Sequence, residues 1–267
     1  MRDSTTRYRP APGVRRLATT IPLFALAALL TTGPVHAQDL PAADDLIDRY
    51  VELIGGEAAF SEVGSHTTGT ISMPAMGLQG TFEIFQSPPD QMVMRMDLPG
   101  IGEIQQGYNG EVGWSLNPLM GPQIMEGAEL AQTREQAVLA AALRDESVVP
   151  GRETVEQSEY EGETCWVVAL TWASGRESTD CYSTESGLLL ASETTQASPM
   201  GEIRATTIYQ DYQDFDGRLL PGRMIQRSSG QEQILVVNSV EYREISPDQF
   251  TLPAPIQTLV GSEDGSR

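Results

Sequence analysis

The sequence predicts a mainly β protein: a large, curved antiparallel sheet (a half-barrel), with an N-terminal helix and a helical lid over its concave face. From residue 65 to residue 244, short runs of alternating apolar and polar residues follow one another between turns rich in Gly, Asn, Asp and Pro. This pattern is typical of an antiparallel meander and not of a nucleotide-binding α/β fold. One segment, residues 126–146, interrupts the meander with a long run of helix-forming residues.

The first 37 residues have the layout of a secretory signal peptide. A start rich in arginine precedes an apolar run from Ile21 to Leu30, and Val35-His36-Ala37 places small residues where signal peptidase reads them. The apolar run is shorter than the ~20 residues that span a bilayer. We therefore expect cleavage after Ala37, export to the periplasm or beyond, and no transmembrane segment in the mature chain.

The mature chain would be strongly acidic. The full sequence carries 17 basic and 37 acidic side chains, and cleavage after Ala37 would leave 12 and 36. An acidic surface repels nucleic acid and anionic lipid headgroups, so we expect no nucleic-acid partner. Residues 38–260 suffice for a single all-β domain. We expect a monomer, with residues 261–267 as a disordered tail.

The elements can be expected in the following order. Apolar residues at helical spacing predict a helix from about Asp44 that ends at Gly55-Gly56, and a helical turn follows at 57–63. Strands are expected at about 65–73, 78–87, 90–98, 101–108 and 111–117, with Asn109-Gly110 as a hairpin turn. After the lid they resume at about 152–160, 163–172, 176–183, 187–196, 201–212, 218–228 and 231–243. A helical turn and an extended segment close the domain at 246–253.

Cys165 and Cys181 are the two cysteines of the chain, and in an oxidising compartment such a pair usually forms a disulfide. The residues between them indicate a hairpin. If its loop is centred on Ala173, the two cysteines lie directly opposite each other. If Gly175 takes the left-handed position of a three-residue loop, they become a diagonal pair, ~7 Å apart at Cβ and too far to bond. We favour the disulfide.

A series of short motifs runs in order along residues 44–253. They are Tyr50-Val-Glu-Leu-Ile-Gly-Gly56, Thr68-Gly69-Thr70, Pro88-Pro89-Asp90, Tyr108-Asn-Gly-Glu-Val-Gly-Trp114, Tyr182-Ser-Thr-Glu-Ser-Gly-Leu188, Asp211-Tyr212 through Pro221, and Phe250-Thr-Leu-Pro253. The series resembles the periplasmic lipoprotein carriers of the outer-membrane lipoprotein-sorting (LolA/LolB-like) superfamily. The resemblance implies a half-barrel whose helical lid covers an apolar concavity that receives acyl chains. It brings no catalytic residue.

No catalytic or metal-binding constellation emerges from the sequence. His66 is the only histidine after residue 37, and no G-x-S-x-G motif accompanies it. One histidine and two cysteines cannot complete a zinc site. Asp214, Asp216 and Gly217 match part of a calcium loop, but Tyr212 and Arg223 would then stand at ligand positions that require oxygen. The sequence predicts a protein without enzymatic activity, cofactor or metal.

Alternation along the strands predicts which side chains share a face of the sheet. Methionine adapts to ligands of varied shape, and a helix of ~20 residues, about 30 Å long, cannot cover so large a concave face. An ordinary core under the helices is the alternative. We expect ligand contacts from the even-numbered apolar residues Phe82, Ile84, Met92, Met94, Met96, Trp114, Leu116 and Trp166.

These observations predict an exported protein that holds a lipophilic ligand, either a lipid or the acyl chains of a lipoprotein, in an apolar cavity. Transient contacts with a protein that donates or accepts the ligand would accompany such a role. The alternative is a periplasmic sensor or interaction module whose concave face binds a protein segment. A long apolar tunnel would favour carriage of a lipophile, whereas a flat exposed strand edge without a cavity would favour the module.

Overall fold

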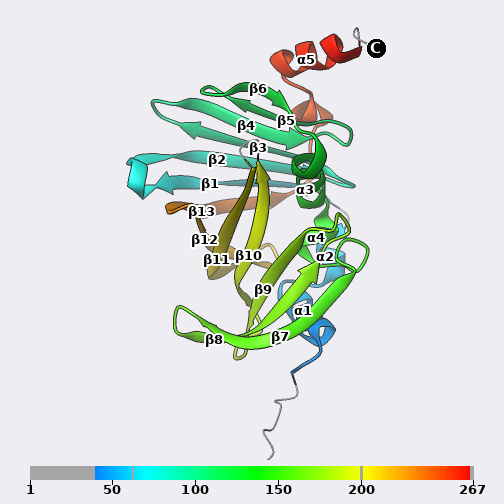
Figure 1. The fold of residues 1–267 in the computed structure, drawn as a ribbon, viewed down its shortest axis with the longest axis vertical. Helices are drawn as coiled ribbons and strands as arrows, with labels where there is room; N and C mark the ends of the chain where they lie inside the picture. The colour runs from blue at the N-terminus through cyan, green and yellow to red at the C-terminus, as the bar shows by residue number, and fades with distance from the viewer. Residues whose placement is uncertain (1–39, 62, 199–200, 265–267) are drawn as a thin grey trace, which may run out of the picture. The chain divides into compact units, whose positions relative to one another are not determined.

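The structure, a computed structural model, describes residues 40–61, 63–198 and 201–264, which lie within one compact unit. The described residues form thirteen strands of a single antiparallel sheet in the order β6-β5-β4-β3-β2-β1-β13-β12-β11-β10-β9-β8-β7 (Figure 1). The sheet is open, with β6 and β7 at its edges. The predicted mainly β half-barrel is thereby confirmed. The predicted signal peptide and its cleavage site lie outside the described residues.

Each strand expected from the sequence is present, with small shifts at the ends. The strands are β1 (Ser65–Met73), β2 (Leu78–Ser87), β3 (Gln91–Leu98), β4 (Gly102–Tyr108), β5 (Gly113–Asn117), β6 (Gly121–Ile124), β7 (Gly151–Tyr160), β8 (Glu163–Thr171), β9 (Glu177–Ser183), β10 (Leu189–Ser198), β11 (Gly201–Phe215), β12 (Arg218–Ser228) and β13 (Gln231–Tyr242). The short strand β6 was not predicted. It contains Pro122, which lowers strand propensity and is tolerated because β6 is an edge strand.

Two meanders join where β1 pairs with β13. On one side β1 to β6 follow chain order, and on the other side β13 to β7 run in reverse chain order. In Figure 1, β1 to β4 run across the view, whereas β10 and β11 rise steeply in front of them. This rotation of strand direction is the accumulated twist that a sheet of many strands acquires.

The N-terminal helices cover the half of the sheet that contains β8 and β9. Helix α1 (Ala43–Leu53) ends at Gly55 and Gly56, which both have positive φ, as predicted. Its buried residues Ile47 and Tyr50 belong to one cluster with Val168 of β8. Helix α2 (Glu57–Ser61) follows directly.

The lid differs from the single helix that the sequence predicted. It consists of α3 (Gly127–Ala137) and α4 (Leu139–Ala142), separated at Val138, whose ψ of 121° is extended. The break lets the two helices pack in different places. Ala137 of α3 contacts Met92 and Tyr108, whereas Ala141 of α4 belongs to the α1 cluster. We call the face of the sheet that carries these helices the inner face, and the opposite one the outer face.

The C-terminal segment packs on the outer face. A 3-10 turn, η2 (Pro247–Phe250), is followed by α5 (Ala254–Asp264). Phe250 and Ile256 are buried against Trp114 of β5 and against Phe85 and Val93 of β2 and β3. The closing helical turn was predicted, but α5 continues through residues 261–264, where the sequence suggested disorder. Residues 265–267 lie outside the described range.

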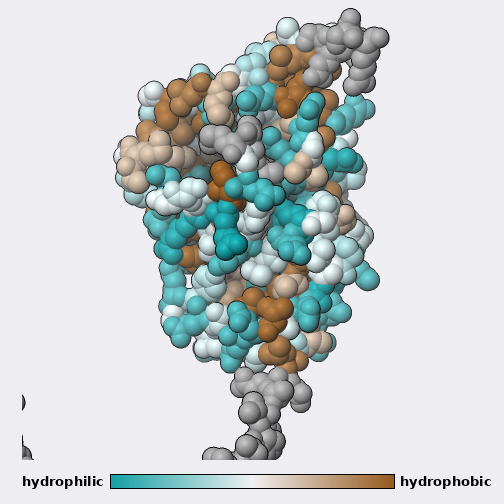
Figure 2. Space-filling model, in the orientation of Figure 1, coloured by the Kyte–Doolittle hydropathy of each residue, from teal (hydrophilic) through white to brown (hydrophobic). Residues whose placement is uncertain are grey.

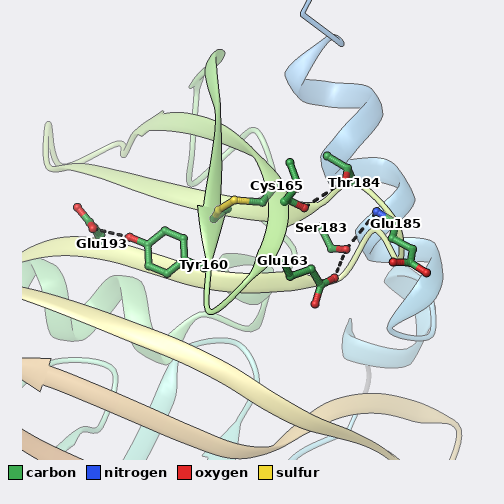
Figure 3. Close-up of a disulfide and its surroundings, with 9 residues drawn as sticks. Tyr160, Glu163, Cys165, Ser183, Thr184, Glu185 and Glu193 are labelled. Carbon is green, nitrogen blue, oxygen red and sulfur yellow. Dashed lines mark hydrogen bonds between the residues drawn. A yellow bond between two sulfur atoms is a disulfide. The ribbon is translucent and has the colours of Figure 1, made fainter.

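The disulfide between Cys165 and Cys181 is present, with a Cα–Cα distance of 5.5 Å (Figure 3). Cys165 pairs with Ser183, and Cys181 with Val167, so the cysteines are a diagonal pair. The loop has three residues, with Gly175 at positive φ. The predicted disulfide is therefore confirmed, but the argument that the diagonal register would prevent it is wrong. The twist between neighbouring strands shortens one of the two diagonals.

Removing this disulfide is expected to lower the free energy of unfolding by about 3 kcal/mol in the chain-entropy model, because the bridge closes a loop between residues 16 apart. Cys165→Ala/Cys181→Ala can be compared with the wild type by urea denaturation. Wild-type protein unfolded in the presence of a reducing agent is the control and should show a similar loss. An unchanged unfolding midpoint in both would contradict the prediction.

Candidate functional site

A cavity of about 430 Å³ lies on the inner face between the sheet and the lid helices. Its apolar lining includes Phe60, Val138, Leu139, Ala141, Trp172, Leu220 and Val240. Its polar lining is smaller in area but comes from both the lid and the sheet: Gln132, Glu135, Gln136, Thr67, Gln86, Ser178, Asp180, Ser192, Thr194, Thr207, Tyr209 and Gln226. The cavity of this protein is therefore mixed in polarity, and the fully apolar concavity expected from the sequence is not what the structure contains.

A buried ion pair forms one wall of the cavity. Nε of Arg144 donates to Oδ2 of Asp180 at 2.7 Å, and the Asp180 side chain is only 1% exposed. Ser192 Oγ donates to the other carboxylate oxygen at 2.6 Å, and the Tyr182 hydroxyl donates to Oδ2 at 3.1 Å. Arg144 also donates from Nη1 to the carbonyl of Ala141, at 2.7 Å. The pair therefore joins the end of the lid to β9.

Burial and the ion pair both shift pKa values in this network. Burial acts to lower the pKa of Arg144, but the Asp180 carboxylate outweighs this effect and the pKa is raised. Arg144 itself takes the left-handed conformation, with φ of 56°. Such a conformation costs a non-glycine residue roughly 1–2 kcal/mol, which the hydrogen bonds of its guanidinium offset. Burial also raises the pKa of Tyr50 to about 12, close to this network.

A second ion pair connects α3 to the sheet. Oε2 of Glu135 accepts a hydrogen bond from Nε of Arg176 at 3.0 Å. Arg176 also donates to Oγ1 of Thr194 on β10 at 2.9 Å, and its guanidinium lies 4.0 Å from the ring centroid of Trp172. Burial lowers the pKa of Arg176, and the charge of Glu135 opposes that shift. The other oxygen of Glu135, Oε1, is buried without a hydrogen-bond partner among the described residues.

A third arginine lines the cavity without such a partner. The guanidinium carbon of Arg218 lies 3.4 Å from the ring centroid of Tyr242 and 5.5 Å from that of Phe60. Within the described ranges, no carboxylate forms an ion pair with Arg218. The Tyr242 hydroxyl is buried, again without a partner in this part of the chain. Burial raises the pKa of Tyr242, Arg218 opposes this shift, and Asp216 and Asp214 add to it.

Beside the cavity, the inner face carries an apolar surface that the lid leaves partly exposed. We call it the methionine patch. Its centre is buried and contains Ile71, Phe82, Leu98 and Val237; its partly exposed members include Met73, Ile84, Met94, Met96, Ile101, Ile104, Met224 and Leu235. Figure 2 shows apolar surface over the hairpin ends of β1 to β4, at the left of the view. Val240 packs against the patch and also lines the cavity, so the two adjoin at this residue.

The structure places five of the predicted contact residues on the inner face near one another, four of them in the methionine patch. Phe82, Ile84, Met94 and Met96 belong to the methionine patch. Phe82 pairs with Met96, and Ile84 with Met94, across β2 and β3. The four side chains therefore lie on one face of the sheet, as alternation predicted. Met92 shares that face but is buried beneath α3 with Tyr108. A role of these residues in ligand binding stays a prediction.

Trp114 and Leu116 lie on the other face, so the prediction that they share a face with the methionines is wrong. Tyr108 pairs with Gly113 across a four-residue loop, and therefore odd positions of β4 pair with even positions of β5. Trp114 stands opposite Gly107 and Leu116 opposite Gln105, both on the outer face. Any hairpin loop with an even number of residues pairs odd-numbered positions of one strand with even-numbered positions of the next. The two-residue turn that the sequence suggested would have done the same.

Trp166 lies on the inner face at the far end of β8, where it pairs with Tyr182. None of the eight predicted contact residues is among the described residues that line the cavity. The cavity is lined instead by arginines and acids that the sequence pattern did not single out. The alternation in β9 to β11 could have indicated them, because the inner-face positions of these strands are polar: Ser178, Asp180, Ser192, Thr194 and Thr207.

His66 packs against an aromatic ring on the outer face of the sheet. Its ring stacks on Phe85 with centroids 4.3 Å apart, and its side chain is only 15% exposed. Glu83 and Glu241 lie 3.6 Å and 3.9 Å from its ring nitrogens. Among the described residues, no group of three or more metal-binding side chains gathers anywhere. In the same part of the chain, no helix has the length and apolar character needed to cross a bilayer.

Comparison with known proteins finds similarity in structure. No family model and no curated protein sequence matches the chain. A LolA superfamily protein from Nitrosomonas europaea superposes with a TM-score of 0.53 at 13% identity, over 79% of this chain and 98% of that one. An outer membrane lipoprotein-sorting protein domain from Vibrio parahaemolyticus gives 0.51 at 11% identity, over 78% and 97%. This chain has the LolA-type fold.

A DUF1329 family protein from Desulfovibrio piger has the same fold, with a TM-score of 0.54 and 11% identity over 79% of this chain and 97% of that one. The resemblance predicted from the ordered motifs is thereby confirmed at the level of the fold. In each case nearly the whole of the other chain is matched, so the half-barrel of this protein corresponds to the complete fold of these proteins and not to a fragment of it.

Proposed function

We propose that this protein is an exported binding protein, not an enzyme, and that its inner face holds the acyl part of a lipid or of an acylated protein. The methionine patch is the observation that carries this proposal. Its side chains are partly exposed on the face that carries the lid, and the patch adjoins the cavity at Val240. Burial of an acyl chain on such a surface contributes about 0.8 kcal/mol per methylene.

The cavity supports the same proposal. Its volume of about 430 Å³ lies within the usual range for small-molecule sites. Its walls combine apolar side chains with hydrogen-bonding ones, as an amphiphile requires. The carboxylates of the cavity are already engaged by arginines, Asp180 by Arg144 and Glu135 by Arg176, which is an arrangement for holding the lid and not for acid-base catalysis.

A charge placed in the methionine patch is expected to weaken binding. Met94→Glu would put a carboxylate among Phe82, Ile84 and Met96, and an ionised group in an apolar contact is costly to desolvate. We expect at least a tenfold loss of affinity for a fluorescent fatty acid, measured by titration.

The matched control is Gln79→Glu, which adds the same charge at an exposed position on the outer side of β2. This variant should bind like the wild type. If well-folded Met94→Glu binds as tightly as Gln79→Glu, the methionine patch is not the acyl site. If wild-type protein binds no fatty acid, lipid or acylated peptide, the proposed function itself is refuted.

A further inference from the structure

The charges that line the cavity do not cancel. Of the charged side chains that line it among the described residues, Arg144 is paired with Asp180 and Arg176 with Glu135, which leaves Arg218. This excess positive charge occurs in a protein whose net charge is −20 and which contains no lysine. In such a chain, an arginine without a carboxylate partner in a cavity calls for a specific explanation.

Arg218 is held in place by apolar contacts instead of by an acid. Its guanidinium carbon lies 3.4 Å from the ring centroid of Tyr242 and 5.5 Å from that of Phe60, so aromatic rings and not an acid lie next to its charge. The edge of a guanidinium carries its N–H donors in a planar fork that matches the oxygens of a carboxylate or phosphate. Contact with the ring of Tyr242 therefore holds Arg218 in place without a carboxylate that would occupy the donors that recognise an anion.

The Tyr242 hydroxyl is the second observation that points to a ligand. It lines the same cavity, is buried, and has no hydrogen-bond partner among the described residues. A buried polar group without a partner destabilises the structure that buries it. The oxygen of an anionic ligand would accept a hydrogen bond from this hydroxyl and at the same time meet the charge of Arg218.

We propose that Arg218 and Tyr242 form a headgroup subsite for an anionic amphiphile, one whose carboxylate or phosphate is bound in the cavity while its acyl chain lies on the methionine patch. This inference rests on the proposed function, and it adds the chemical class of the ligand head. The acidic surface of the protein opposes anions in general, but at physiological ionic strength that field is screened beyond about 8 Å. Selectivity then comes from the local pair of donors.

The test compares amphiphiles that share one acyl chain. Dodecanoate and dodecyl phosphate carry an anionic head, monododecanoyl glycerol carries a neutral one, and inorganic phosphate is the head without the chain. In calorimetric titrations, the wild type should bind both anionic amphiphiles at least tenfold more tightly than the glycerol ester, and inorganic phosphate much more weakly than dodecyl phosphate.

Arg218→Gln should remove this preference by weakening binding of the anionic amphiphiles about tenfold while leaving the glycerol ester unchanged. Arg218→Lys keeps the charge and should retain part of the preference, which separates recognition of the anion from damage to the fold. Arg204→Gln, at an exposed position of β11 outside the cavity lining, removes the same charge and should have no effect.

The outcomes are distinct. If the wild type binds all three amphiphiles equally and Arg218→Gln changes nothing, the headgroup subsite is refuted while acyl binding stands. If inorganic phosphate binds as tightly as dodecyl phosphate, the site recognises a free anion and the assignment to an amphiphile head is overturned. If no amphiphile binds, the proposed function falls together with this inference.

Discussion

Asp180→Ala is expected to lower the free energy of unfolding by about 3–5 kcal/mol, because it leaves the Arg144 guanidinium buried without its counter-ion. The same substitution removes the acceptor for the hydroxyls of Ser192 and Tyr182. Urea denaturation followed by tryptophan fluorescence would measure the loss.

A double-mutant cycle identifies the cause. Arg144→Ala alone should also destabilise the fold, but Asp180→Ala/Arg144→Ala should cost less than the sum of the two single changes, because the uncompensated charge is then absent. Glu232→Ala is a control, since it breaks the half-exposed ion pair with Arg227 on β12 and β13 and should change stability by no more than ~1 kcal/mol. Additive single effects, or a loss at Asp180 no larger than at Glu232, would contradict a tightly coupled buried pair.

The importance of Asp180 extends to the lid. Arg144 contacts the carbonyl of Ala141 at the end of α4 as well as Asp180 on β9. The pair therefore fixes where the lid leaves the sheet, and Glu135 with Arg176 fixes the other lid helix. These two links define the roof of the cavity, so loss of either is expected to alter its shape before it alters the strands.

Local patterns in the sequence were sufficient to predict most of the strands. Alternation and turn residues depend on neighbours within a few positions, and they located β1 to β5 and β7 to β13. The lid was less predictable, because the break at Val138 depends on where Ala137 and Ala141 find partners in the folded sheet. The disulfide was predicted correctly from composition and compartment, although the expected geometry of its diagonal register was not.

The cavity could not be derived in the same way, because its contacts join residues far apart in the chain. Arg144 and Asp180 are 36 positions apart, and Glu135 and Arg176 are 41 positions apart. Nothing in the local pattern marks them as partners. The contact of Arg95 is likewise with a residue far away in the chain. Alternation places Arg95 on the face opposite the methionines, but does not reveal that its guanidinium donates to Gln249 of the C-terminal segment at 2.8 Å.

Trp114 provides the sharpest contrast between the sequence interpretation and the structure. The sequence placed it among the ligand contacts, whereas the structure buries it on the outer face, 1% exposed, with Phe250 and Ile256. Its ring fills the space over Gly107, where a Cβ would approach the ring to 2.8 Å. Trp114→Ala would leave a cavity under the C-terminal segment. We expect it to lower the free energy of unfolding by about 3–5 kcal/mol in urea denaturation.

Trp114→Phe distinguishes a core residue from a ligand contact. Phenylalanine keeps much of the ring and removes the indole N–H, which is buried without a hydrogen-bond partner among the described residues. We therefore expect a smaller loss of stability, below ~2 kcal/mol, and unchanged affinity for a fluorescent fatty acid. Met94→Glu should show the opposite behaviour in the same two measurements, because its partly exposed side chain lies on the inner face. If a folded Trp114→Phe protein no longer binds the fatty acid, Trp114 contacts the ligand. The interpretation that Trp114 serves only to pack the outer face is then refuted.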